Sequence, residues 1–224
     1  MSAPRIGGVV LALLLASGVE LAQAQPVRLS PLRPPRLEPV FGVRGFGEAA
    51  SQQFLASDTF DAIFGDHRGI FGGGGGQFRW KNLIVEVSAS RFKETGERVF
   101  VTNGEVFKLG IPSTITIRPI ELTGAWRFPP IWRFRPYAGG GVGQHRYKET
   151  SRFAEASENV NFTERSFHVA GGGEIRLWRW IAAAGEVRYR SVADAIGEGG
   201  ASREFSEEDL GGTSVALRLI FVAR

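Results

Sequence analysis

Hydrophobic and polar residues alternate with a two-residue period along most of the chain from residue 40 onward. This alternation is typical of β-strands that have one apolar and one polar face. The pattern predicts eight strands, at about residues 40–54, 68–79, 82–93, 112–127, 134–148, 163–178, 181–192 and 211–222. Because helix signals are almost absent between them, we expect an all-β fold.

The connections between these segments differ in length. Three are very short, namely "RWKN", "FPPIWR" and "WRW", and the others are long and polar, such as "SDTFDAIFGDHR" and "KETSRFAEASENVN". Short turns at one end and long loops at the other are typical of transmembrane β-barrels of the bacterial outer membrane. The pattern therefore predicts an eight-stranded antiparallel up-and-down transmembrane β-barrel over residues 40–224.

The two faces of the predicted strands differ in charge. In the segment 181–192, Val187 and Tyr189 fall on one face, whereas Glu186 and Arg188 fall on the other. A soluble sandwich turns its apolar face inward, but a barrel in a bilayer turns that face to lipid and encloses the polar face. We therefore expect a salt-bridged, largely occluded lumen that contains Arg44, Glu48, Glu86, Glu121, Arg127, Glu174, Arg176, Glu186, Arg188, Arg190 and Arg218.

The tryptophans gather at one end of the predicted barrel. They lie in or beside the three short turns, at Trp80, Trp126, Trp132, Trp178 and Trp180. Tryptophan favours membrane interfaces because its ring is apolar while its N–H needs a polar partner. We interpret these residues as an interfacial girdle, which places the short turns on the periplasmic side.

Glycines, 30 in all, occur in runs such as "FGGGGGQFRW" (71–80) and "PYAGGGVGQH" (136–145). No run has the G-x-x-x-x-G-K-[ST] form of a phosphate-binding loop. The interior of an eight-stranded barrel is only just wide enough for side chains. We therefore expect the strand glycines to make room for luminal arginines and to permit tight curvature of the sheet.

The first 39 residues carry two further signals. Arg5, the apolar run 9–19 and "AQA" (22–24) predict a secretory signal peptide over residues 1–24, cleaved after Ala24. Residues 25–39 are rich in proline and predict an extended periplasmic tether. The chain has no cysteine and a formal charge of +4. Since its charges are interleaved rather than clustered, we expect no nucleic-acid partner.

The eight-segment layout, the stretches "RPYAGGGVGQHRY" (135–147) and "HVAGGGEIRLWRWIAAAGEVRYRSV" (168–192), and the apolar final segment resemble the small OmpA-like outer-membrane β-barrel proteins. The resemblance covers nearly the whole chain after the predicted signal peptide. It implies a monomeric integral protein of the outer membrane of a Gram-negative-type bacterium, in contact with outer-membrane lipid.

Three histidines are the candidates for chemistry. Some eight-stranded barrels are lipid A deacylases, which resemble one another in a His-x-Ser pair facing lipid. Here Ser166 and His168 fall on the predicted luminal face instead. His67 lies near Asp66 in the first long loop and could join a weak metal site, but a solvated loop residue is the better interpretation. His145 has no partner that the sequence identifies, and no HExxH or similar metal-binding spacing occurs. We expect no enzyme activity, no cofactor and no metal.

The connection at 98–109, "RVFVTNGEVFKL", predicts a protruding hairpin. Asn103-Gly104 between alternating residues is the sequence of a type I′ turn. It places Phe100 opposite Phe107 and Val101 opposite Val106. An apolar cluster this far from lipid needs a cover. The cover is either a binding partner, such as an extracellular protein or surface ligand, or the segment 151–162 of the same chain.

Pro119 interrupts the alternation in "TITIRPIELTGAW". Because a closed barrel has no edge to accommodate a residue without an N–H, we expect Pro119 to lie at a bulge or beyond the membrane. The apolar outward band then contains Ile115, Ile117, Ile120 and Leu122, with a change of parity near Arg118. An unbroken ladder from the predicted turn would place Glu86 opposite Glu121, an unfavourable pair of like charges.

These observations predict an outer-membrane barrel, not an enzyme, with a structural or interactive role at the cell surface through its extracellular loops and the 98–109 hairpin. Two alternatives stay open: a narrow channel for small solutes, and a lipid A-modifying enzyme.

Overall fold

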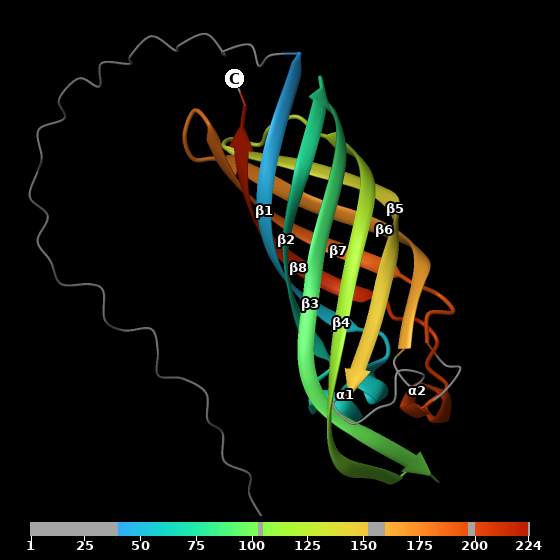
Figure 1. Ribbon diagram of the computed structural model, residues 1–224. Coiled ribbons are helices and arrows are strands. Elements are labelled where there is room, and N and C mark those ends of the chain that lie inside the picture. Colours follow the sequence, from blue (N-terminus) through green and yellow to red (C-terminus); the bar gives the residue numbers. More distant parts are fainter. Residues whose placement is uncertain (1–39, 103–104, 152–159, 197–199, 224) are drawn as a thin grey trace, which may run out of the picture. The chain divides into compact units, whose positions relative to one another are not determined.

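The computed structural model describes residues 40–102, 105–151, 160–196 and 200–223 (Figure 1). The predicted signal peptide (1–24), the predicted tether (25–39) and the predicted turn at Asn103-Gly104 lie outside these residues.

Eight antiparallel strands form one closed barrel in chain order. They are β1 (Phe41–Phe54), β2 (Arg68–Trp80), β3 (Leu83–Thr102), β4 (Glu105–Arg127), β5 (Phe134–Ser151), β6 (Val160–Arg176), β7 (Ile181–Ser191) and β8 (Gly212–Val222). The barrel closes where β1 pairs with β8, with Glu48 directly opposite Arg218. The predicted all-β, up-and-down architecture is confirmed.

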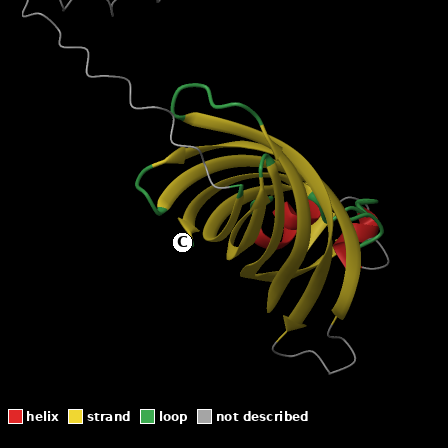
Figure 2. Cartoon of the chain, turned by 90° about the horizontal axis from the view of Figure 1, so that it is seen from above, coloured by secondary structure: helices red, strands yellow, loops and turns green. Residues whose placement is uncertain are grey.

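The two ends of the barrel differ, as the lengths of the connections predict. The short turns lie at one end, and the long connections lie at the other together with α1 (Ser57–Phe64) and α2 (Gly200–Glu204) (Figure 1). Figure 2 shows the strands curving around a common interior, with both helices at its far end. The sequence pattern missed these helices because they are too short to show a helical period. No helix in the described residues is long and apolar enough to cross a membrane.

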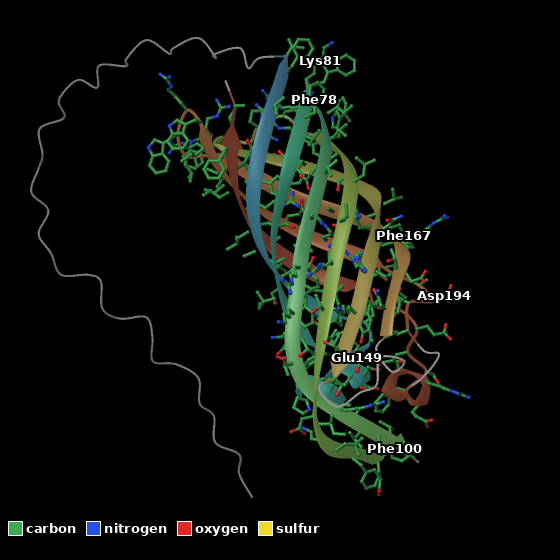
Figure 3. The ribbon with its side chains drawn as sticks, viewed as in Figure 1. Phe78, Lys81, Phe100, Glu149, Phe167 and Asp194 are labelled. Carbon is green, nitrogen blue, oxygen red and sulfur yellow. The ribbon has the colours of Figure 1, made fainter. Side chains whose placement is uncertain are left out.

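The outer surface of the barrel is apolar and the inner surface is charged. Leu217 is 74% exposed, whereas its neighbour Arg218 is only 4% exposed. Phe167 likewise points away from the barrel (Figure 3). This arrangement inverts that of a soluble domain, because lipid takes the place of the apolar core. The chain is therefore a transmembrane β-barrel.

All five tryptophans are exposed at the short-turn end. Their exposed fractions run from 49% at Trp80 to 89% at Trp132. The set is Trp80, Trp126, Trp132, Trp178 and Trp180. Lys81 and Arg133 lie over the rings of Trp80 and Trp132, at 5.6 and 5.7 Å from the ring centroids. A mixture of aromatic rings and cations is what a membrane–water interface favours.

An apolar cluster fills the interior at the loop end. Its buried members come from several strands, from α1 and from the connection before β8, and include Phe54, Phe60, Phe71, Phe92, Ile115, Ile117, Tyr147, Val192 and Leu210. Phe54 stacks on Phe60 with ring centroids 3.9 Å apart. These large side chains pack where the charged lumen ends, so they close the barrel on the loop side.

The expectation of a bulge at Pro119 is wrong. β4 pairs with β5 in unchanged register through Pro119, which lies opposite His145. The missing N–H is tolerated because the pairing of β3 with β4 is interrupted only locally, between Ala89↔Ile120 and Phe92↔Ile117, without a change of register. Consequently Ile115 and Ile117 do not face lipid but point inward, each 1% exposed.

The ladder breaks nearer to the hairpin tip. Glu97 pairs with Pro112, but Val99 pairs with Lys108, so β4 has two residues more than β3 between these pairs. Gly110 lies within this bulge at φ +67°, a conformation that favours glycine. The shift places Glu86 opposite Thr123 instead of Glu121, which avoids the unfavourable pair of carboxylates.

Glycine allows neighbouring strands and side chains to approach the backbone closely inside the barrel. A Cβ atom added at Gly141 would overlap the carbonyl oxygen of Leu122 and lie 2.9 Å from the ring of His168. The sequence suggested that such glycines make room for arginines. At this position the neighbours are the adjacent backbone and a histidine.

We expect Gly141→Ala to lower the free energy of unfolding by about 1–3 kcal/mol, because overpacking forces neighbouring groups to shift. Urea unfolding in detergent micelles, followed by tryptophan fluorescence, measures this change. Gly124→Ala is the matched control, since a Cβ there meets nothing within 4 Å. Equal stability of the two variants would contradict close packing at Gly141.

Candidate functional site

The centre of the lumen contains a network of buried ion pairs. Arg188 on β7 donates through Nη2 to Glu186 Oε1 at 2.7 Å and also pairs with Glu121 on β4. Arg190 Nε lies 2.7 Å from Glu121 Oε1. Residues on opposite walls of the barrel are thereby joined across its interior.

Arg218 on β8 connects this centre to β1 and β3. Its Nη1 lies 3.0 Å from Glu86 Oε2 and 3.1 Å from Glu186 Oε2, and its Nη2 lies 3.0 Å from Glu48 Oε2. The guanidinium also lies over the ring of Phe46, 4.7 Å from the centroid. One arginine therefore contacts three carboxylates, and a buried aromatic ring supports it.

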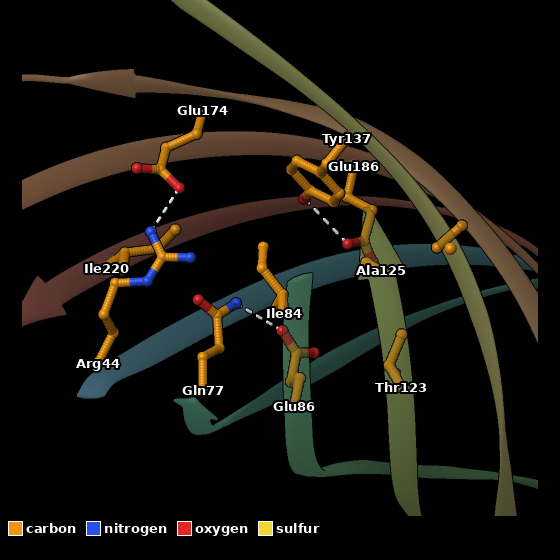
Figure 4. A pocket seen from close by; sticks show the side chains of 12 residues that line it. Arg44, Gln77, Ile84, Glu86, Thr123, Ala125, Tyr137, Glu174, Glu186 and Ile220 are labelled. Atoms are coloured by element: carbon orange, nitrogen blue, oxygen red, sulfur yellow. Dashed lines mark hydrogen bonds and ion pairs between the residues drawn. The ribbon is translucent and has the colours of Figure 1, made fainter. Parts of the chain in front are cut away.

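A second group of ion pairs lies nearer to the short turns. Arg44 Nη1 lies 2.6 Å from Glu174 Oε2, and Arg127 Nη2 lies 3.7 Å from Glu174 Oε1. Figure 4 shows the first of these pairs beside the hydrogen bond from Tyr137 Oη to Glu186 Oε2, which is 2.9 Å long. The two groups make one continuous polar interior.

The structure brings together ten of the eleven charged residues predicted for the lumen. The exception is Arg176, which is exposed at the end of β6. The alternation gives Arg176 the same parity as the buried Glu174. It lies where the strand ends, however, so its side chain is open to solvent. The two-residue period predicts on which face of the strand a residue lies, but not how far it lies from the end of the barrel.

The sequence interpretation missed several uncharged luminal partners. Gln77 donates to Glu86, and Gln52 accepts from Arg190. Tyr137 binds Glu186. These residues have the same strand parity as charged luminal neighbours, so the alternation could have identified them as luminal. The predicted luminal set contained charged residues alone, and it also omitted Arg79, which is 4% exposed.

Little space remains inside the barrel. The cavity lined by Arg44, Gln77, Glu86 and Tyr137 among others has a volume of about 10 Å³ (Figure 4). This is near the minimum that holds a single water molecule. Beyond the ion pairs, the apolar cluster around Phe54 and Phe60 fills the loop end. The described part of the lumen is therefore occluded by charged residues and then by apolar ones.

The histidine and serine on β6 lie inside the barrel. His168 Nε2 is 2.9 Å from Thr123 Oγ1 and is 1% exposed. Ser166 is also buried. Neither side chain reaches the outer surface, where a lipid substrate would lie.

One small group in the first long connection has the composition of a metal site. Ligand atoms of Asp61, Asp66 and His67 lie within 4.8 Å of one another. His67 Nδ1 is 3.1 Å from each carboxylate oxygen of Asp61. The two aspartates are exposed, so the hydrogen bonds of a surface loop account for the arrangement.

The hairpin formed by β3 and β4 extends beyond the barrel and bends to one side (Figure 1). Phe100 lies opposite Phe107 and Val101 opposite Val106, in the register predicted from the sequence. Phe100 is 58% exposed and Phe107 is 47% exposed, whereas Val101 is buried. Figure 3 shows Phe100 near the tip of the hairpin.

Both edges of this hairpin are unpaired within the described residues. β2 pairs with β3 only as far as Arg91, and β5 pairs with β4 only from Ser113. In the described residues, β3 beyond Arg91 and β4 before Ser113 therefore pair with no strand other than each other, although α1 packs against β3 at Gly96. Unpaired strand edges can pair with a further strand.

Neither a scan of protein-family models nor a search of the curated proteins gives a match. Solved structures do match. The outer membrane protein OprG of Pseudomonas aeruginosa matches with a TM-score of 0.56 at 13% identity, covering 82% of this chain and 96% of that one. Neisserial surface protein A (NspA) matches with a TM-score of 0.50 at 12% identity, covering 83% and 97%.

At these identities the likeness shows the fold, which is that of the small OmpA-like outer-membrane β-barrels. Single-chain barrels with an even number of antiparallel strands and an apolar outer band are proteins of the bacterial outer membrane. The fold therefore places this chain in an outer membrane.

We expect Glu186→Ala to lower the free energy of unfolding by about 3–5 kcal/mol, because the buried Arg188 and Arg218 both lose one of their carboxylate partners. The midpoint of urea unfolding in detergent measures this loss. Glu94→Ala removes an exposed carboxylate and should change stability by less than about 0.5 kcal/mol. If both variants unfold like the wild type, the lumen is hydrated rather than salt-bridged.

Proposed function

We propose that this protein is an occluded outer-membrane barrel that presents the β3–β4 hairpin to a protein partner at the cell surface. The observation that carries this proposal is the pair of exposed rings, Phe100 and Phe107, on a hairpin whose outer edges pair with no other strand in the described residues. The barrel supplies the anchor, and the ion pairs of the lumen make that anchor rigid.

The lumen is poorly suited to transport. Its central cavity holds about 10 Å³, and the ion pairs of Arg188 and Arg218 cross it. A solute would have to displace buried ion pairs, at a cost of several kcal/mol for each unpaired charge. The apolar cluster at the loop end adds a second obstruction. Function at the outer surface is therefore favoured over a channel.

An enzymatic role in lipid modification has no support in the geometry. Ser166 and His168 lie inside the barrel, and His168 makes its hydrogen bond to Thr123. Acyl chains of lipid contact the outer wall, where the exposed side chains are apolar. We therefore propose a non-enzymatic function.

The hairpin has two properties that favour a protein partner. Its free edges offer backbone N–H and C=O groups to a further strand, and backbone hydrogen bonds of this kind give affinity in β-augmentation. Its exposed rings would supply the apolar anchors, since aromatic side chains dominate many interfaces. On the opposite face Val101 is buried and Val106 is 41% exposed, so the face with Phe100 and Phe107 is the one that presents two exposed aromatic rings to a partner.

We expect a photo-cross-linking amino acid at Glu105 to give a protein adduct on intact cells, because Glu105 is exposed and lies two residues from Phe107, on the same face of β4. Phe100→Ser/Phe107→Ser should abolish this adduct while leaving barrel folding intact. A gel shift between the heated and unheated protein reports folding.

Two controls make this result specific. The cross-linker at Asp194, which lies in another loop at the same end of the barrel (Figure 3), should give no such adduct. Phe167→Ser removes an exposed ring from the outer wall instead of the hairpin, and should leave the adduct from Glu105 unchanged. An adduct that survives Phe100→Ser/Phe107→Ser would refute the proposed binding face.

We expect the purified wild-type protein to give no steady ion conductance in planar bilayers, because the described lumen has no room for a hydrated ion. Discrete conductance steps that change with Arg188→Ala would support the narrow channel instead. Barrel folding is verified beforehand by the same gel shift.

A further inference from the structure

A positively charged groove crosses the outer wall of the barrel near its loop end. It has a volume of about 340 Å³ and is lined by side chains from β3, β4 and β5. Three threonines contribute hydroxyl groups, and the cations are Arg91, Lys93, Arg118, Arg146 and Lys148. No carboxylate lines the groove.

The cations of this groove lie close together without compensation. Arg118 lies directly opposite Arg146, and Lys93 and Lys148 flank Thr116 on either side. Like charges in opposite positions destabilise a sheet. Within the described residues, Arg91, Lys93, Arg118 and Lys148 form no ion pair. Arg146 donates to the uncharged Asn161, at 3.3 Å. The groove therefore needs an anion from outside the chain.

The position of the groove indicates where that anion comes from. On β4, the outward residues next to Arg118 towards the short turns are Ile120 and Leu122, both half or more exposed. On β5, Val142 is 60% exposed and Arg146 follows four residues later. The groove thus begins where the apolar outer band ends, which is the level of lipid headgroups.

We propose that the groove binds the phosphate groups of a lipid headgroup in the outer leaflet. Arginine forks match phosphate oxygens with two parallel hydrogen bonds, lysine adds a point charge, and threonine hydroxyls complete the set of donors. A lipid also places its acyl chains along Ile120, Leu122 and Val142 directly below. A soluble anion would gain nothing from contact with this apolar wall. The site is independent of the hairpin, since none of its residues is Phe100 or Phe107.

The test compares lipids that differ only in phosphate. The full chain is placed in phosphatidylcholine nanodiscs that contain either diphosphorylated lipid A or the same lipid without phosphates. We expect the phosphorylated lipid to raise the thermal unfolding midpoint of the wild type and to be retained through purification. Arg118→Gln/Arg146→Gln should weaken retention by about tenfold or more for each lost charge-assisted contact.

A second readout separates binding from general stability. Without phosphorylated lipid, Arg118→Gln/Arg146→Gln should be at least as stable as the wild type, because it relieves the repulsion between the two arginines. Lys81→Gln/Arg133→Gln removes two exposed cations at the opposite end, and should leave retention unchanged. Loss of stability without phosphorylated lipid, or equal loss of retention in both double variants, would overturn the proposal.

Two soluble probes test the source of the anion. Inorganic phosphate in the millimolar range should not reproduce the stabilisation in nanodiscs without phosphorylated lipid. Heparin, a sulfated polysaccharide, should bind no more tightly to the wild type than to Arg118→Gln/Arg146→Gln. If either probe stabilises the wild type as well as the lipid does, the groove is a site for soluble anions and the lipid proposal is wrong.

Discussion

The compensation of charge inside a narrow barrel is the constraint on which the rest of this structure depends. An isolated charge in a low-dielectric interior costs several kcal/mol, so every buried glutamate must meet an arginine from another strand. Arg218 satisfies this for Glu48, Glu86 and Glu186, which come from three different strands. Each such contact depends on the register of several strands at once. The network therefore favours one closed arrangement over arrangements shifted by two residues.

The sequence was sufficient for the fold because one rule, the two-residue period, applies to all eight strands. In a barrel within lipid the apolar and charged faces are so different that a shift by one residue would expose charge to lipid. Parity therefore assigned Glu186, Arg188 and Arg218 to the lumen. The pairing of Phe100 with Phe107 was predictable for another reason, since a two-residue turn fixes the register next to it.

Other features depend on contacts that no local pattern encodes. The identity of the glutamate that each arginine contacts depends on the stagger between distant strands, such as β4 and β7. The inward direction of Ile115 and Ile117 was mispredicted because a change of parity was expected near Pro119. The register shift lies instead at the bulge around Gly110. The apolar closure at the loop end combines single residues such as Phe60 and Leu210 with strand ends. Arg176 had the right parity but lies at the rim.

A closed lumen moves the chemistry of the protein to its outer surface, and that surface changes along the barrel axis. Tryptophans and scattered cations occupy the short-turn end, an apolar wall follows, and the groove around Arg118 and Arg146 lies above it. The hairpin with Phe100 lies beyond the groove, since β3 passes Arg91 and Lys93 before it reaches Phe100. Each zone carries the side chains that the adjoining layer of a membrane favours. The uncompensated cations of the groove cost stability in the isolated chain. Their presence at headgroup level is consistent with a protein whose native state includes the surrounding lipid.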